Sequence, residues 1–198
     1  MTPTNRQNDH LDDCNKLVQE VFSRYKDHED IPYISSNRDL EKWLDEVEFG
    51  SAHLVSKRNM ERFEEDVLPG HLILLWRIGF GTFTNESIFP KYFEYDYGIN
   101  AKEALIDIQE KGYAIELSAL DSLTYLHAAK LKAILKAFDV SGYSKMKKDE
   151  LIDLTREKIS EANLAPLFEV RGYQLTPTGK ALLEKYPNPV DRHPKKNM

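Results

Sequence analysis

The chain has 198 residues, a length that suits one ordinary domain or two small ones. Apolar residues make up 41% and aromatic residues 11%, which is too many for a disordered chain. A single cysteine excludes an internal disulfide framework and any zinc site built from several cysteines. The longest apolar run, residues 72–76, is too short to cross a membrane, and the N-terminus has no signal-like apolar run. We therefore expect a cytoplasmic protein with no membrane partner.

Charge is divided unevenly along the chain. Residues 1–124 contain 13 Lys and Arg against 24 Asp and Glu, whereas residues 125–198 contain 14 against 9. The two parts therefore differ in sign, at −11 and +5, and sum to the net charge of −6. Such a division is typical of a chain with two different partners, although solvated helix faces also produce it.

Helical patterns fill the acidic region of residues 1–68. Apolar residues recur at three- and four-residue spacing, and cap-like residues precede the second segment. The first helix would carry Cys14 on its buried face. The predicted helices cover residues 12–25, 36–50 and 57–67.

The region of residues 69–124 combines helices with one strand. The pattern predicts a short buried helix over 71–80, with a strand as the alternative, and further elements at 89–98, 100–112 and 113–117, the last a strand. Helix, turn, helix and strand in this order resemble the second half of a winged helix. A DNA-reading version would place residues 100–111 in a major groove. Glu103, Asp107 and Glu110 would bring the wrong sign to phosphates, which favours a structural or protein-binding module.

Two short helices with a polar loop between them are predicted in the basic third. The first carries Leu131, Ile134 and Leu135 on one face and ends near residues 139–140. The second opens at Lys147 or Lys148 and has its own apolar face. Two short helices enclose only a small core, so we expect apolar side chains of the loop to complete it.

The run from Gly142 to Ile152, GYSKMKKDELI, carries a resemblance to a known family. It resembles the helix-extended-loop-helix modules, above all the N-terminal module of the Rho transcription terminator, over about residues 128–159. It is also similar to the SAP domain, except that Met146 stands where SAP loops place a glycine. Members of this family are generally associated with nucleic acid and few are catalytic. The resemblance therefore implies a non-catalytic nucleic-acid-binding module.

The residues expected to bind nucleic acid surround the loop. Lysines and free backbone N–H groups at a helix start are both suited to phosphates. Phosphate contact and an ordinary solvated face remain open for Lys145, Lys147 and Lys148, and core packing is favoured for Tyr143. The full predicted set is Lys130, Lys132, Lys136, Tyr143, Ser144, Lys145, Lys147 and Lys148.

The rest of the C-terminal region, residues 125–186, is expected to end in a hairpin and a helix. Residues 168–176 predict a hairpin that turns at Arg171-Gly172, and Thr176-Pro177 predicts the start of a last helix. This order resembles the wing and closing helix of bacterial winged-helix regulators. The basic tail of residues 187–198 is expected to be extended and mobile.

Motifs for catalysis or metal binding are missing from the sequence. No two of the six histidines share a metal-ligand spacing, and there is no Walker loop and no nucleophile elbow. We therefore expect no metal, no cofactor and no enzymatic activity.

The expected fold is mainly α with short β-hairpins. It comprises a helical N-terminal part, a winged-helix-like middle and a C-terminal helix-extended-loop-helix with a hairpin and a closing helix. The expected function is that of a bacterial or phage protein that binds nucleic acid, DNA in preference to RNA, through the C-terminal module. Its acidic part would bind a protein partner or a second copy. The alternatives are an acidic interaction protein that imitates nucleic acid, and a metal-dependent nuclease.

Overall fold

The computed structural model describes residues 16–194, which are mainly helical with one small antiparallel two-stranded sheet. The mainly helical class expected from the sequence is therefore confirmed. Within the described residues, unit 1 contains residues 16–73, 89–105 and 191–194, and unit 2 contains residues 74–88 and 106–190. Each unit is thus assembled from separate stretches of the chain.

Unit 1 consists of helices and long connections. Residues 16–24 are helical, and Val21 and Tyr25 from this segment are buried. Its other elements are α2 (Leu40–Glu48), η1 (Lys57–Asn59) and α4 (Tyr92–Tyr95), and it shares α3 (Pro69–Gly79), α5 (Ala101–Glu110) and α10 (Asn188–Arg192) with unit 2.

A buried arginine holds α4 to the segment before α2. The Arg38 side chain is only 3% exposed and pairs with the Glu94 carboxylate through its Nε, at 2.9 Å. Its guanidinium also lies over the rings of Trp43 and Tyr95, 5.1 and 4.1 Å from their centroids. Hydrogen bonds and cation–π contacts together compensate for the burial of this charge.

Two predictions for unit 1 need correction. The predicted helix over residues 57–67 is wrong: only η1 is helical, and the chain then runs without a helix to a turn at Asp66, whose φ is 58°. Met60 and Val67 of this segment are nevertheless buried. The helix predicted over residues 36–50 begins later, at α2, because its cap is Asp39, whose carboxylate accepts from the Lys42 N–H at 3.0 Å. The prediction for Cys14 lies outside the described residues.

The predicted extended tail is also wrong over residues 188–192, which form α10. The following His193 is buried, and its Nδ1 lies 2.8 Å from the Tyr97 hydroxyl. The His193 and Tyr97 rings also lie close together, with their centroids 5.7 Å apart. These contacts hold the segment against α4 and the residues after it, which its proline content did not indicate. The basic residues 195–198 lie outside the described part of the chain.

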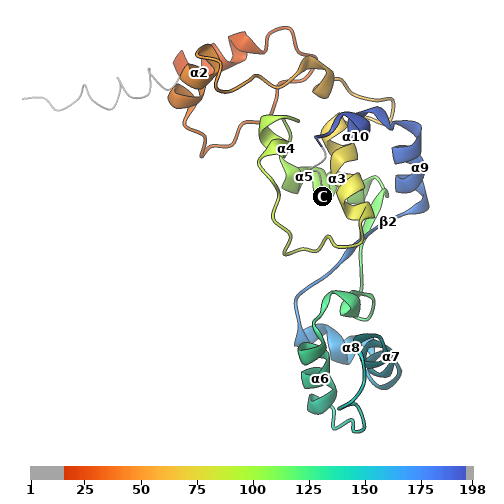
Figure 1. Cartoon of the computed structure of the whole chain (residues 1–198). Coiled ribbons are helices and arrows are strands. Elements are labelled where there is room, and N and C mark those ends of the chain that lie inside the picture. Colours follow the sequence, from red (N-terminus) through yellow and green to blue (C-terminus); the bar gives the residue numbers. More distant parts are fainter. Residues whose placement is uncertain (1–15, 195–198) are drawn as a thin grey trace, which may run out of the picture. The chain divides into compact units, whose positions relative to one another are not determined.

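Unit 2 combines a small sheet with a cluster of helices. Figure 1 shows α6, α7 and α8 gathered together. In chain order its own elements are β1 (Ala114–Glu116), η2 (Asp121–Tyr125), α6 (Ala128–Ala137), α7 (Lys148–Lys158), α8 (Glu161–Leu164), η3 (Ala165–Leu167), β2 (Tyr173–Leu175) and α9 (Pro177–Lys185).

The two strands of the sheet are far apart in sequence. Strands β1 and β2 pair antiparallel, with Ala114 opposite Leu175 and Glu116 opposite Tyr173. All the residues between the strands, including α6 and α7, thus form one long insertion between two paired strands. The local hairpin predicted within residues 168–176 is wrong. The two residues of the expected turn bind residues elsewhere in the chain: the Arg171 N–H donates to Asn85 Oδ1 at 2.9 Å, and Gly172 forms a β-bridge with Thr84.

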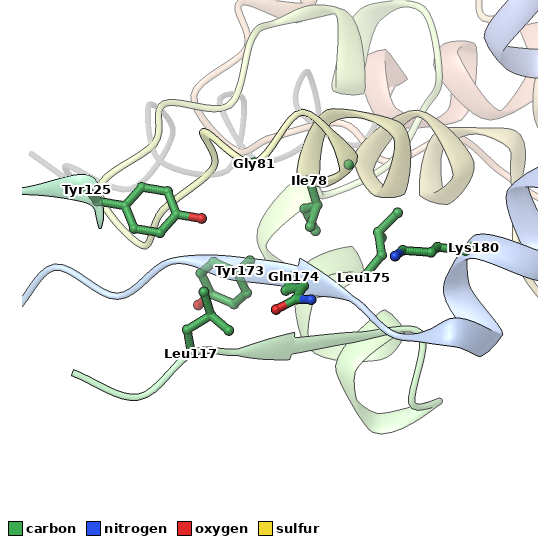
Figure 2. A pocket seen from close by; sticks show the side chains of 9 residues that line it. Ile78, Gly81, Leu117, Tyr125, Tyr173, Gln174, Leu175 and Lys180 are labelled. Carbon is green, nitrogen blue, oxygen red and sulfur yellow. The ribbon is translucent and has the colours of Figure 1, made fainter. Parts of the chain in front are cut away.

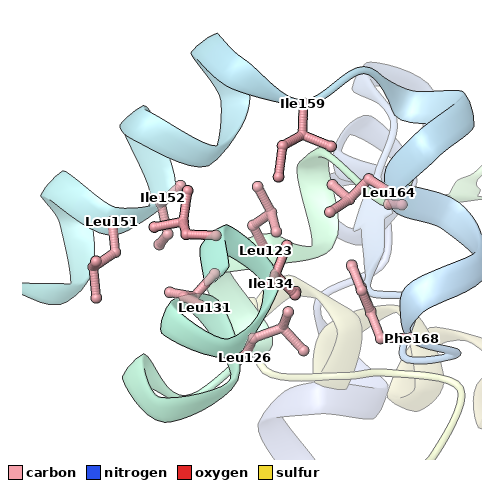
Figure 3. Close-up of a cluster of buried hydrophobic side chains, with 11 residues drawn as sticks. Leu123, Leu126, Leu131, Ile134, Leu151, Ile152, Ile159, Leu164 and Phe168 are labelled. Atoms are coloured by element: carbon pink, nitrogen blue, oxygen red, sulfur yellow. The ribbon is translucent and has the colours of Figure 1, made fainter. Parts of the chain in front are cut away.

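The insertion has its own apolar core (Figure 3). Leucines from η2, α6, α7 and α8 meet there and are fully buried. Val140, Tyr143 and Met146 of the loop are partly buried against them. The expectation that the loop helps to complete a small core is therefore confirmed. The fully buried leucines are Leu123, Leu131, Leu135, Leu151 and Leu164.

Helix α9 packs so closely that only glycine fits at one position. Its Thr176 cap accepts from the Gly179 N–H at 3.0 Å, as the sequence predicted for this helix start. A methyl group on Gly179 would lie 2.0 Å from the carbonyl oxygen of Tyr113. Backbone meets backbone at this contact, so no side-chain rotation relieves it.

We expect Gly179→Ala to destabilise the protein, although alanine is the better helix former. Overpacking of this kind costs about 1–3 kcal/mol. For a chain of this size each kcal/mol lowers the melting temperature by about 2–4 °C. Thermal unfolding followed by circular dichroism measures the effect, with exposed Thr178→Ala on the same helix as the control. An unchanged midpoint for Gly179→Ala would show that the contact is not close in solution.

Candidate nucleic-acid interface

The candidate interface is the surface of α6, α7 and the loop of residues 138–147. Helix α6 ends where Asp139 takes a φ of 52°, and the Val140 N–H returns to the Leu135 carbonyl at 3.0 Å. The helix therefore ends in a C-terminal cap with a left-handed residue. Gly142 also has a positive φ, 87°, which allows the chain to turn back toward α7.

The start of α7 is capped by its own side chain. The Lys147 N–H donates to Glu150 Oε2 at 2.7 Å, which is half of a capping box. One of the free N–H groups expected to receive a phosphate is thus already bonded. The carboxylates of Asp149 and Glu150 in the first turn interact favourably with the helix dipole and stabilise α7. They also reduce the positive potential at the N-terminus of the helix.

Two of the predicted lysines are bound to the backbone. Lys132 Nζ donates to the Ser144 carbonyl at 2.9 Å, which joins α6 to the loop. Lys148 Nζ donates to the Thr124 carbonyl at 2.6 Å, which joins α7 to η2. Both ammonium groups therefore hold the fold of the insertion, a role that the sequence pattern did not reveal.

Four other predicted lysines extend into solvent. Their side chains make no hydrogen bond or ion pair within the part of the chain that the structure describes. One group of two lies on α6, and the other lies on either side of Met146, next to the start of α7. These four residues, which we call the free lysines, are Lys130, Lys136, Lys145 and Lys147.

Tyr143 and Ser144 differ from each other in the structure. Tyr143 is half-buried and packs against the core of the insertion, which is the packing role favoured from the sequence. Ser144 is exposed, and its carbonyl is the one that Lys132 binds. The structure therefore brings the predicted residues onto one helix–loop–helix, but it gives them three different environments.

A carboxylate fastens α8 to the segment before η2. Glu161 accepts from the Ala119 and Leu120 N–H groups, both at 2.8 Å. Partial burial alone would raise the pKa of Glu161, but the hydrogen bonds from Leu120 and Ala119 outweigh it and hold the pKa below its usual value. These bonds fix the end of the insertion opposite the loop.

We expect Glu161→Gln to lower the free energy of unfolding at pH 7 by about 1 kcal/mol, because two charge-assisted bonds weaken. A lowered folded-state pKa stabilises the protein above the unfolded value of about 4.3, and this stabilisation is lost as the pH falls below it. Urea unfolding of both proteins at pH 7 and in acid measures the difference. Exposed Glu169→Gln is the control, and a pH-independent gap would contradict the role of the charge.

Comparison with known proteins adds no relative. No family model, curated protein or solved structure matches the chain. Among residues 16–194, no three His, Cys, Asp or Glu side chains gather as metal ligands, and no helix is long and apolar enough to span a membrane.

Proposed function

We propose that the protein binds nucleic acid without catalysis, DNA in preference to RNA, through the helix–loop–helix of about residues 128–159. The observation that carries the proposal is the set of free lysines around a loop that Lys132 joins to α6. Residues 128–159 contain eight Lys and Arg against five Asp and Glu. The resemblance of the run from Gly142 to Ile152 to Rho N-terminal and SAP-like modules supports the same conclusion.

Lysines of this kind contact phosphates rather than bases. An ammonium on a long flexible side chain acts as a point charge and carries little base information. Lys145 and Lys147 flank Met146, which packs inward. Binding should therefore depend strongly on salt and weakly on sequence.

The setting of the module also agrees with a winged-helix-like scaffold. Helix α5 precedes β1, and β1 pairs with β2 as the two strands of a wing would. In the proposed arrangement the helix–loop–helix is an insertion in the wing. Helix α5 carries Glu103, Asp107 and Glu110, so the scaffold presents the module and does not itself read DNA.

We expect the double variant Lys145→Gln/Lys147→Gln to bind duplex DNA more weakly for all sequences. Loss of two phosphate contacts should flatten the plot of log affinity against log salt by up to about 1.8. Fluorescence anisotropy of the full-length protein at several salt concentrations measures this slope. The control Lys91→Gln/Lys102→Gln removes the same charge from exposed positions of unit 1. Equal slopes for the two variants would refute this interface.

Leu151→Ala should behave in the opposite way. Leu151 is fully buried in the core of the insertion, so truncation should cost about 2–5 kcal/mol of stability. Its melting temperature should fall before any change in salt dependence is measurable, whereas the lysine variant should keep its melting temperature. Differential scanning calorimetry of both variants separates a lost fold from a lost contact.

An acidic interaction protein is the second candidate, and α2 is the observation that favours it. This helix buries Trp43 and Leu44 and carries four carboxylates but one lysine. Its surface would suit a basic partner protein or a second copy. This candidate becomes the better one if the full-length protein fails to bind DNA at low salt.

A further inference from the structure

A pocket in unit 2 lies apart from the helix–loop–helix surface (Figure 2). Its volume is about 320 Å³, which is at the lower end of the range for small-molecule sites. The end of α3, the strand β2 and the start of α9 line it, together with Leu117 and with Tyr125 of η2. Every lining residue belongs to unit 2, so the pocket is formed within one compact part of the chain.

The walls of the pocket are mainly apolar. Ile78, Leu117 and Leu175 contribute aliphatic side chains. Gly79 and Gly81 contribute none, and a methyl group built on Gly81 would meet nothing within 4 Å. The space is therefore left open by the absence of side chains on one wall.

Three polar groups line the same pocket without a partner. Within the described residues, the hydroxyl of Tyr125, the amide of Gln174 and the ammonium of Lys180 make no side-chain hydrogen bond or ion pair. In Figure 2 Tyr125 and Lys180 approach β2 from opposite ends of the pocket. A tyrosine phenol is protonated at neutral pH and can donate a hydrogen bond, and burial raises the pKa of Tyr125 further.

The position of Tyr125 is fixed by the chain itself. Its ring lies so close to Gly172 that a methyl group there would be 2.1 Å from Cε2. Tyr173 also lines the pocket, but its hydroxyl already donates to Glu116 at 2.8 Å. The donors left for a ligand are therefore Tyr125, Gln174 and Lys180.

We propose that this pocket binds a small apolar molecule with one carboxylate, whose charge is met by Lys180 and whose body lies against Ile78, Leu117 and Leu175. An aromatic or branched carboxylate fits because the walls are apolar and the one charged lining group is a cation. The site shares no residue with the proposed nucleic-acid surface, and its test does not depend on DNA binding.

A matched pair of probes tests the proposal on the full-length protein. 2-Naphthoate and 2-naphthamide have the same shape and differ in charge. Each is titrated while the methyl NMR signals of Ile78, Leu117 and Leu175 are followed. We expect saturable shifts of these signals and tighter binding of 2-naphthoate. Lys180→Gln should remove about three- to fivefold of the preference, as for a solvent-exposed ion pair.

Two further variants complete the design. Lys185→Gln removes the same charge from α9 at a position that does not line the pocket, so it should keep the preference. Leu117→Trp should fill the pocket and abolish binding of both probes with little change in melting temperature, because Leu117 is half-buried. Equal binding of the two probes, an unchanged preference in Lys180→Gln, or shifts confined to methyl groups outside the pocket would each overturn the proposal.

Discussion

The antiparallel pairing of β1 with β2 is the constraint on which unit 2 depends. It closes a connection of residues 117–172, and three contacts secure the point of closure. The Leu117 N–H donates to the Gly172 carbonyl at 2.8 Å, the Gly172 N–H donates to Ser122 Oγ at 3.0 Å, and the Tyr125 ring lies against the same glycine. Closing a long loop costs conformational entropy. The apolar core of the insertion offsets this cost, because it stabilises the loop independently of the strand pairing. The same closure carries Tyr125 to the wall of the pocket, so the helical module and the pocket share one anchor.

Local sequence patterns predicted most helices. They failed where the structure depends on a segment that is distant in the sequence. Helices α3, α6, α7 and α9 lie where apolar spacing and capping residues placed them, because those signals act within one or two turns. The hairpin over residues 168–176 failed because strand pairing is non-local. Tyr173 and Leu175 have the alternation of a strand, but this alternation does not specify a partner. The partner is β1, and only the tertiary fold brings it close.

The candidate site shows the same limit at the level of single side chains. The sequence indicated a cluster of lysines around the loop, which follows from spacing alone. It could not separate Lys132 and Lys148 from the others, because their acceptors are main-chain carbonyls of Ser144 and Thr124. Every residue has a main-chain carbonyl, so the residue type does not indicate which carbonyl will accept a hydrogen bond. The sequence did not indicate the pocket either. The pocket depends on Gly81 and on the approach of Tyr125 from a remote segment, and only the tertiary fold brings these together.

The distribution of charge around α7 bears on the proposal that this surface binds nucleic acid. Lys145, Lys147 and Lys148 lie within four residues and repel one another. The Thr124 carbonyl and the acidic first turn of α7 partly relieve this repulsion at Lys148. The side chains of Lys145 and Lys147 make no hydrogen bond or ion pair within the described residues, and neither contributes to the core. Neither ammonium group therefore has a role within the insertion. The proposed function would give them one, because a polyanion such as nucleic acid would engage both at once.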